Sequence, residues 1–434
     1  MVTIPSSYHI QEQEEVITGS GSTPISPPRF PSNVQRKVLD HLFQSMHRTI
    51  GGMFRWKLDL LKLYSQVNKQ WREWTRFEYF RYPAFNLSTM MPFGLLPPTI
   101  INWDKIHCSL DRRSRLADQG YSPLGLKLKV DNPRGRVMKP WKKALEKIIK
   151  QYKAVPYFEL VLDDTESGGY FELIWRFPHL KRVFVCSFPL GENLQSAIVF
   201  PPTPSLSSLP KTLVRLDLAF IVLEHWNLPL PSIRILTLDH VRFGRRTSSF
   251  EQMVETCRNV FGSFPNLAAL ALDGLCRLTS DALSKLGMFK IKQLYLGQCC
   301  FKPTLGCDSE FPQGNWKMRE TTFLQCLARH LRTRIKHLYL PSCTQATSIL
   351  EHLLSSRIDG QCPFYLARIE SICIAPPPER DGKTEEERAK AKEDEKLIAG
   401  SFCQTVGLRG VTVKFWDKFD EIPLSEWDPK EDTK

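Results

Sequence analysis

The chain has 434 residues, of which 42% are hydrophobic and 24% are charged, and it carries a net charge of +13. These proportions are ordinary for a soluble protein, and no stretch approaches the ~18 consecutive apolar residues of a membrane-spanning helix. The N-terminus has neither a basic region nor an apolar core, so a signal peptide is not expected. The cysteines of so long a chain are therefore expected to be reduced thiols, which argues against a secreted disulfide framework.

The basic excess is confined to one part of the chain. Residues 29–150 contain 24 Lys and Arg against 9 Asp and Glu, whereas residues 151–434 contain 35 against 34. Residues 1–28 contain three Glu and no basic residue. This distribution predicts an acidic partner for the N-terminal part, either an acidic protein or nucleic acid. The alternative is a basic surface that serves solubility alone.

The N-terminal part is expected to be a disordered tail followed by helices. Residues 1–28 are rich in Ser, Thr, Gly, Pro and Glu, a composition typical of disorder. Apolar residues at helical spacing predict a helix over 34–47 and further helical stretches over 58–67 and 71–80. A basic helix is expected over 140–152.

From about residue 125 to residue 413 the chain repeats the pattern Leu-x-x-Leu-x-Leu or a conservative copy of it. An incomplete copy is Leu126-Leu128-Val130. The clean copies begin at Tyr157, Leu180, Leu213, Ile233, Leu267, Ile291, Ile335, Ile369 and Leu408. The fourth and sixth residues of a copy share one strand face, and a single short strand cannot bury that face alone. The pattern therefore predicts an α/β solenoid, with parallel strands on one face and helices or loops on the back.

The expected domain organisation follows from these segments. A helical domain over 29–90 and a linker over 91–122 precede a solenoid over 123–417. A charged disordered insertion over 376–398 interrupts the last copies, and an acidic tail follows over 418–434. The insertion begins with a proline cluster and continues as a dense mixed-charge run, which indicates a solvated loop with transient helix. A binding arm is the alternative.

The strand face opposite the apolar stripe is expected to be exposed and to recognise a partner protein. Two tyrosines occupy equivalent fifth places, and aromatic residues of this kind often anchor interfaces. The alternative is that tyrosine simply suits a strand surface. The candidate substrate-binding residues are Arg215, Asp217, Asp239, Asp273, Lys292, Tyr295, Lys336 and Tyr339.

Three copies carry a more specific pattern. Those beginning at Ile291 and Ile335 have Cys299 and Cys343 in the ninth place, and the copy before them continues Leu-Thr-Ser-Asp-Ala-Leu from Leu278. These features resemble the cysteine-containing leucine-rich repeat, although Leu275 fills the cysteine place of that earlier copy. Both cysteines are interpreted as small core residues under the strands.

The helical domain resembles an F-box. That family's pattern begins Leu-Pro, continues through an amphipathic helix to Asp-Leu-Leu, and ends Val-x-Lys-x-Trp-Arg. This chain has Phe30-Pro31, then Asp59-Leu60-Leu61, and finally Val67-Asn-Lys-Gln-Trp71-Arg72. It departs from the pattern in the replacement of the first Leu by Phe30 and in a longer connection over 44–57.

The resemblance implies a role in ubiquitin ligation. F-box proteins bind a Skp-type adaptor and through it a cullin, while their repeats hold the substrate protein. Some of the matching residues must instead pack the core of the domain. By position, the adaptor-binding candidates are Pro31, Val34, Leu39, Leu42, Leu60, Leu61, Val67 and Trp71.

Catalysis is not expected, because the sequence has no nucleophile elbow, phosphate-cradling glycine loop or metal-ligand cluster. The pair Asp163-Asp164 is interpreted as a solvated loop start. We therefore expect a protein of the cytoplasm or nucleus that uses no cofactor or metal, avoids membranes and recognises a partner. One alternative is a scaffold whose N-terminal helices only cap the solenoid. The other, ranked last, is nucleic-acid binding through residues 29–150.

Overall fold

The computed structural model falls into two compact units, residues 1–45 and 46–434, and most of α1 (Ser32–Arg48) belongs to the first. The structure describes single positions scattered between residues 384 and 404. The remaining described residues are 31–48, 54–87, 110–112, 115, 122–131, 138–163, 167–187, 196–199, 210–224, 226, 229–244, 250–273, 291–296, 335–340, 370–374 and 412–415.

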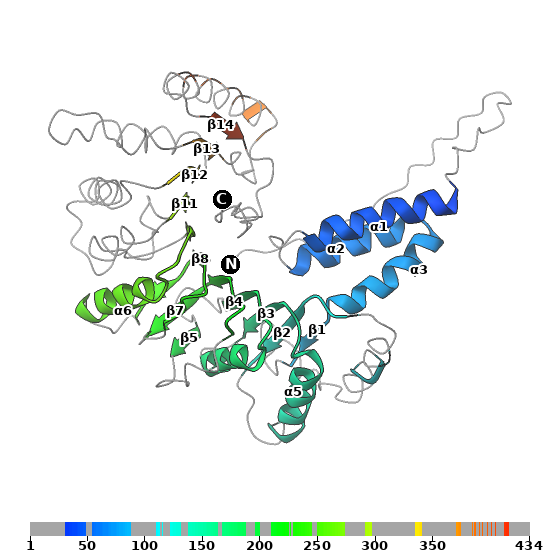
Figure 1. Ribbon diagram of the computed structural model, residues 1–434, viewed down its shortest axis with the longest axis horizontal. Helices are drawn as coiled ribbons and strands as arrows, with labels where there is room; N and C mark the ends of the chain where they lie inside the picture. Colours follow the sequence, from blue (N-terminus) through cyan, green and yellow to red (C-terminus); the bar gives the residue numbers. More distant parts are fainter. Residues whose placement is uncertain are drawn as a thin grey trace. The chain divides into compact units, whose positions relative to one another are not determined.

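A parallel sheet of 11 strands dominates the second unit (Figure 1). Its order follows the chain, which is the arrangement of a solenoid, and the predicted α/β class with parallel strands is confirmed. The strands are β1 (Ala84–Asn86), β2 (Leu126–Val130), β3 (Tyr157–Leu162), β4 (Arg182–Ser187), β6 (Arg215–Ala219), β8 (Ile235–Asp239), β10 (Ala269–Asp273), β11 (Gln293–Leu296), β12 (His337–Leu340), β13 (Ser371–Ile374) and β14 (Thr412–Phe415).

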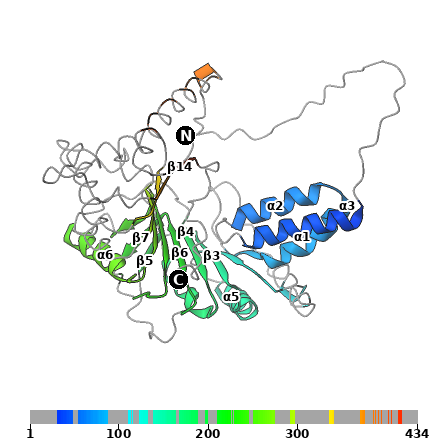
Figure 2. The same ribbon diagram turned by 45° about the horizontal axis from the view of Figure 1, so that its top comes forward.

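A layer of helices and a second, smaller parallel sheet cover one face of the large sheet (Figures 1 and 2). The helices of this layer are α5 (Met138–Tyr152), the 3-10 helix η4 (Ser167–Arg176) and α6 (Phe250–Gly262). The smaller sheet has the order β5 (Ser196–Val199), β7 (Ile221–Glu224) and β9 (Arg242–Phe243). Buried apolar residues of the strands from β1 to β13 belong to one continuous core, which also includes residues of this layer.

The core between the two layers joins strand leucines to aromatic residues of the covering layer. Phe158 of β3 stacks on Phe177, which follows η4, with ring centroids 4.7 Å apart. The indole of Trp141 is buried in α5 and donates a hydrogen bond of 2.8 Å to the carbonyl of Leu87. A buried indole N–H needs such a partner, so this bond connects α5 to the start of the sheet.

The predicted repeat frame holds in the middle of the sheet and is wrong by two residues at its start. The copy predicted to begin at Tyr157 would put Leu160 in the fourth place, opposite Val183. In the structure Phe158 pairs with Val183, so this copy begins at the buried Val155. Tyr157 therefore lies outside the core instead of anchoring it. Leu126 pairs with Phe158, which moves the incomplete copy by the same two residues. Strand side chains alternate with period two, so an apolar run fits either frame equally well.

The last copy is shifted in the opposite direction. Val413, rather than Val411, pairs with Ile372, and Lys414 pairs with Cys373. Thr412, the fifth residue of the copy that begins at Leu408, lies one pair earlier, opposite Ser371.

Helices α2 (Phe54–Gln66) and α3 (Lys69–Glu78) lie near the two stretches predicted for them. Between them Asn68 caps α3, because its Oδ1 accepts a hydrogen bond of 2.8 Å from the backbone N–H of Trp71. The short helix η1 (Tyr79–Arg81) then leads directly into β1. The large sheet thus begins at residue 84, inside the segment predicted to be wholly helical.

The charged segment predicted to be disordered is helical at the positions described between 386 and 404. Thr384 and Glu387 form a capping box: each backbone N–H donates to the other side chain, at 3.1 and 3.3 Å. A helix start therefore follows the proline cluster. In the described part of the chain, no helix combines the length and the apolar content needed to cross a bilayer.

Replacing Leu236 by Ala tests the shared core. Leu236 is fully buried between β6 and β10, so we expect the free energy of unfolding to fall by about 2–5 kcal/mol. Urea denaturation measures the change. Leu63→Ala on the exposed side of α2 is the matched control and should change stability by less than about 0.5 kcal/mol. Equal effects of the two substitutions would contradict a core at Leu236.

Candidate functional site

The large sheet has a second face, which we call the polar face, made of the strand side chains that point away from the core. Its central row crosses the sheet in register, one residue from each strand. Adjacent strands lie about 4.8 Å apart, so neighbours in the row are close enough to interact. From β2 to β13 the row is Lys127, Glu159, Phe184, Asp217, Thr237, Ala271, Tyr295, Tyr339 and Cys373.

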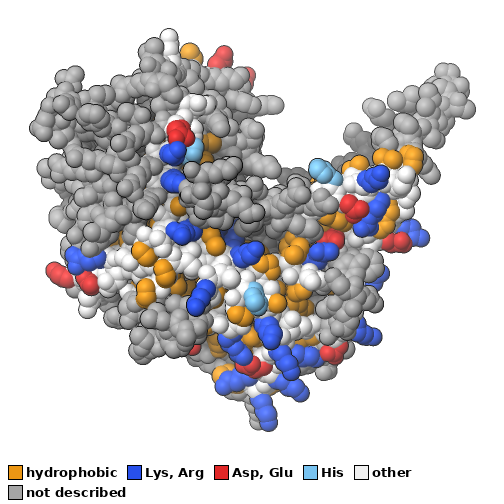
Figure 3. Space-filling view, viewed as in Figure 1, with side chains coloured by type: hydrophobic (Ala, Val, Ile, Leu, Met, Phe, Trp, Pro, Cys, Tyr) orange, Lys and Arg blue, Asp and Glu red, His pale blue; other side chains and the backbone are white. Residues whose placement is uncertain are grey.

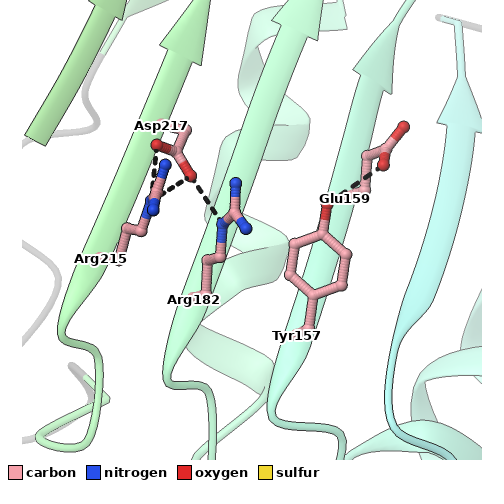
Figure 4. A network of polar contacts seen from close by, with 5 residues as sticks. All are labelled: Tyr157, Glu159, Arg182, Arg215 and Asp217. Atoms are coloured by element: carbon pink, nitrogen blue, oxygen red, sulfur yellow. Dashed lines mark hydrogen bonds and ion pairs between the residues drawn. The ribbon is translucent and has the colours of Figure 1, made fainter. Parts of the chain in front are cut away.

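Two arginines share one carboxylate on the polar face (Figure 4). Arg182 donates through Nε to Asp217 Oδ2 at 2.8 Å. Arg215 donates through Nε to both oxygens of Asp217, at 2.9 and 3.0 Å. All three side chains are buried. Charge-assisted hydrogen bonds of this kind are strong in a site of low dielectric, so they hold β4 and β6 in one arrangement.

Tyr157 extends this group of side chains toward the start of the sheet. The Arg182 guanidinium lies over the Tyr157 ring, 5.3 Å from its centroid. The Tyr157 hydroxyl donates to Glu159 Oε2 at 3.2 Å, and Glu159 also forms an ion pair with Lys127. The pairs together form a continuous polar network from β2 to β6, which Figure 4 shows in part.

The surroundings fix the protonation states in this network. Burial would raise the pKa of Asp217, but the guanidiniums of Arg182 and Arg215 hold that pKa below its usual value. Burial, with the Glu159 carboxylate, raises the pKa of Tyr157 well above its usual value, so the phenol remains a hydrogen-bond donor. Burial and Glu159 also raise the pKa of the Cys186 thiol to about 12. Near neutral pH that thiol is protonated and is a poor nucleophile.

The next strands of the polar face carry an apolar patch in and beside their central row, with Asp239 and Asp273 at the strand ends. Ile235, Ala269, Ala271 and Tyr295 form a buried cluster, and Tyr339 packs against it. Tyr295 and Tyr339 are direct partners in the register of β11 and β12. The polar face is therefore divided into a charged half over β2–β6 and an apolar and aromatic patch over β8–β12.

Two equivalent strand ends bear strained backbone. Phe220 after β6 and His240 after β8 have positive φ values of 55° and 50°, which side chains other than Gly rarely adopt. Their rings stack with centroids 4.7 Å apart, and Nδ1 of His240 lies 2.6 Å from an Asp239 oxygen. The sharp turns direct the chain from the large sheet into β7 and β9.

Six of the eight predicted substrate-binding residues lie on the polar face, whereas Lys292 and Lys336 directly precede β11 and β12, and not all eight are exposed. Arg215, Asp217 and Tyr295 are buried, contrary to the expectation of an open strand surface. The reason is that Arg215 and Asp217 pair with each other while Tyr295 packs in the apolar cluster. Of the others, Lys336 is exposed and the rest are half-buried: Asp239, Asp273, Lys292 and Tyr339.

Sequence reasoning missed four members of the network, namely Lys127, Tyr157, Glu159 and Arg182. The frame shift in β3 assigned Tyr157 to the core and left Glu159 without a role. The signal that could have found them is Val155, an apolar residue two places before Tyr157 that starts the correct frame. Asp163, interpreted as a solvated loop start, is in fact buried and forms an ion pair with Lys129 at 3.0 Å. Asp164 lies outside the described residues, as do Cys299 and Cys343.

The predicted adaptor-binding residues divide into two groups. Leu39, Leu61 and Trp71 are buried, and the Trp71 ring meets Tyr64 edge-on at 6.4 Å. Leu42 and Leu60 are half-buried. The exposed members are Pro31, Val34 and Val67.

Neither a scan against known protein families nor a search of curated proteins gives a match to this chain. Among the described residues, no group of three or more His, Cys, Asp and Glu side chains could hold a metal ion. What the polar face offers chemically is paired charge beside an aromatic patch, a combination suited to contact with another protein surface.

Replacing Asp217 by Asn tests the charge network. The substitution leaves two buried guanidiniums without their carboxylate, so the free energy of unfolding should fall by about 3–5 kcal/mol. The matched control is Asp111→Asn, which breaks an exposed ion pair with Lys147 and should cost less than about 1 kcal/mol. Chemical denaturation at pH 7 compares the two, and equal losses would show that the network contributes little.

The same variant predicts a pH dependence. Because the folded pKa of Asp217 is depressed, its ionised form adds stability at pH values above the unfolded pKa of about 3.9. That contribution is lost as the pH falls through the lower folded pKa. The stability gap between the natural chain and Asp217→Asn should therefore narrow below about pH 4. Urea denaturation from pH 7 to pH 3 measures the gap, and a constant gap would contradict the assignment.

Proposed function

We propose that this protein is a substrate-recognition subunit of an SCF-type cullin-RING ubiquitin ligase. Its N-terminal helices would act as an F-box that binds a Skp-type adaptor, and its leucine-rich-repeat sheet would bind the substrate protein. The observation that carries the proposal is the exposure of large apolar side chains on α1 and α2, ahead of a parallel repeat sheet. Such a ligase subunit would work in the cytoplasm or nucleus.

The exposed apolar side chains occur in pairs at helical spacing. Val34 and Val38 on α1 are 39% and 48% exposed, and Leu63 on α2 and Val67 at its end are 59% and 57% exposed. Residues four apart lie on the same side of a helix, so each pair forms a small apolar patch. Among the described residues, Leu397 is the one other large hydrophobic side chain so exposed. Each of the two patches, taken by itself, favours a role in binding.

The structure changes which residues we assign to the adaptor. Leu39, Leu61 and Trp71 match the F-box pattern but are buried, so we assign them to internal packing. Val38 and Leu63, which sequence reasoning did not select, join Val34 and Val67 as the proposed contact residues.

The main alternative is a repeat scaffold in which the helices only cap the solenoid. A cap exists to cover the apolar end of the array, so its large apolar residues should be buried. The buried set fits a cap as well as it fits an F-box. The four exposed side chains favour the F-box, because capping gives them no partner to pack against.

The proposed substrate surface is the polar face. Tyr339, half-buried beside the aromatic patch, is better placed for contact than the buried Arg215 and Asp217. We therefore assign the arginine–aspartate network to holding the strands and the aromatic patch to recognition.

The adaptor proposal predicts the behaviour of Leu63→Asp/Val67→Asp. The chain should co-purify with a Skp-type adaptor, and this double substitution should weaken binding by at least about tenfold, because it places two charges in an apolar interface. Isothermal titration with the full-length chain measures the affinity. Leu397→Asp, in the charged segment, is the matched control and should bind as the natural chain does. No binding by the natural chain would rule out the ligase role.

A further inference from the structure

Helix α5 has two faces of opposite chemistry. Its apolar face is buried in the core and consists of Trp141, Ala144, Leu145, Ile148, Ile149 and Tyr152. The remaining nine positions of this 15-residue helix carry five lysines, one glutamate, Met138, Pro140 and Gln151. The helix is about 22 Å long at its usual rise, so its outer face is an extended cationic surface. The predicted basic helix is thereby confirmed, and its charge is placed on the outside.

Most of these lysines have no ion-pair partner among the described residues. Glu146 is occupied by Arg176, which donates to both of its carboxylate oxygens at 2.7 and 2.6 Å. Lys147 pairs with Asp111 at 2.7 Å. The other lysines of the helix are exposed, and no described carboxylate neutralises them: Lys139, Lys142, Lys143 and Lys150.

The cationic surface continues past the end of α5 along the corners where strands begin. Lys153 follows the helix, Lys181 precedes β4 and Lys211 lies before β6, and all three are exposed. Backbone bonds place the last two corners side by side, since Val214 N–H donates to the carbonyl of Lys181 at 2.9 Å. We call these seven lysines, from Lys139 to Lys211, the lysine surface. Figure 3 shows blue side chains gathered over α5 and the neighbouring corners.

The composition of the lysine surface selects among acidic partners. Protein interfaces are depleted in lysine and need apolar or aromatic anchors, whereas the apolar residues of α5 are committed to the core. Binding to an anionic lipid surface depends on buried apolar area as well as on charge, and the burial of these residues removes the apolar contribution. Phosphate backbones need only a row of cations at suitable spacing, because each contact releases condensed counterions. Nucleic acid is therefore the partner that fits best.

We propose that the lysine surface binds nucleic acid through its phosphate backbone, independently of base sequence. This activity is separate from the proposed adaptor contact, since it uses none of the exposed apolar residues of α1 and α2. It would place a nucleic acid strand along the outer side of the repeats, opposite the polar face. Contacts to phosphate alone carry no sequence information, so binding should be tolerant of sequence.

Fluorescence anisotropy with the full-length chain tests the proposal. The probes are a 20-base-pair DNA duplex, an RNA duplex of equal length and a single-stranded DNA, each of random sequence. With about four to seven phosphates contacted, the logarithm of the association constant for the DNA duplex should fall against the logarithm of the salt concentration with a slope of about −4 to −6. No measurable binding to any probe at low salt would overturn the proposal.

Two triple variants with the same net charge locate the binding surface. Lys142→Gln/Lys143→Gln/Lys150→Gln should make the salt slope less steep by about 3 and weaken binding to every probe. The control, Lys37→Gln/Lys69→Gln/Lys390→Gln, removes three exposed lysines elsewhere and should bind as the natural chain does. Thermal unfolding verifies that both variants are folded.

Further outcomes would overturn the assignment. Equal losses in the two triple variants would mean that binding follows net charge and not this surface. Competition by polyglutamate as strong as by DNA, at equal charge concentration, would indicate an acidic protein partner. Tighter binding to phosphatidylserine vesicles than to nucleic acid would indicate a membrane surface.

Discussion

The constraint on which the rest of the structure depends is the parallel register of the 11-stranded sheet. The register aligns the apolar side chains of the strands from β1 to β13 into one continuous core, which also includes apolar residues of α5, η4 and α6. No repeat could bury its stripe alone, so the stability of each strand depends on its neighbours. The covering layer varies from helix to small sheet because it needs only to be apolar on its inner side.

The same register dictates the chemistry of the opposite face. Alternate residues of each strand point to the polar face and line up with those of the next strand. Charged side chains on neighbouring strands are therefore close together, even where they are buried. Arg182, Asp217 and Arg215 are adjacent in this way and satisfy one another while buried. Further along the sheet small and aromatic residues occupy the same rows, which replaces charge by an apolar patch. The division of the polar face thus follows from which residue each repeat puts in a few fixed places.

The molecule carries three surfaces of different chemistry. The helices α1 and α2 expose branched apolar side chains, the polar face offers an aromatic patch beside paired charge, and α5 exposes lysines. The apolar surfaces suit an adaptor and a substrate protein, whereas the lysine surface suits a polyanion. A ligase subunit that also held nucleic acid would meet substrates that are themselves bound to nucleic acid, which joins the two proposals without making either depend on the other.

The sequence by itself determined the α/β class, the parallel strands and the basic helix, because the repeated Leu-x-x-Leu-x-Leu spacing and the lysine run are local patterns with one physical interpretation. It did not determine the frame of the first and last copies, since a shift of two residues keeps the same face of a strand. Only the tertiary structure decided that Tyr157 leaves the core, that Arg215 and Asp217 are buried, and that Leu39, Leu61 and Trp71 pack inward while Val38 and Leu63 are exposed. Burial depends on which neighbours a side chain meets across strands and helices, and that information is not contained in the spacing of residues along one segment.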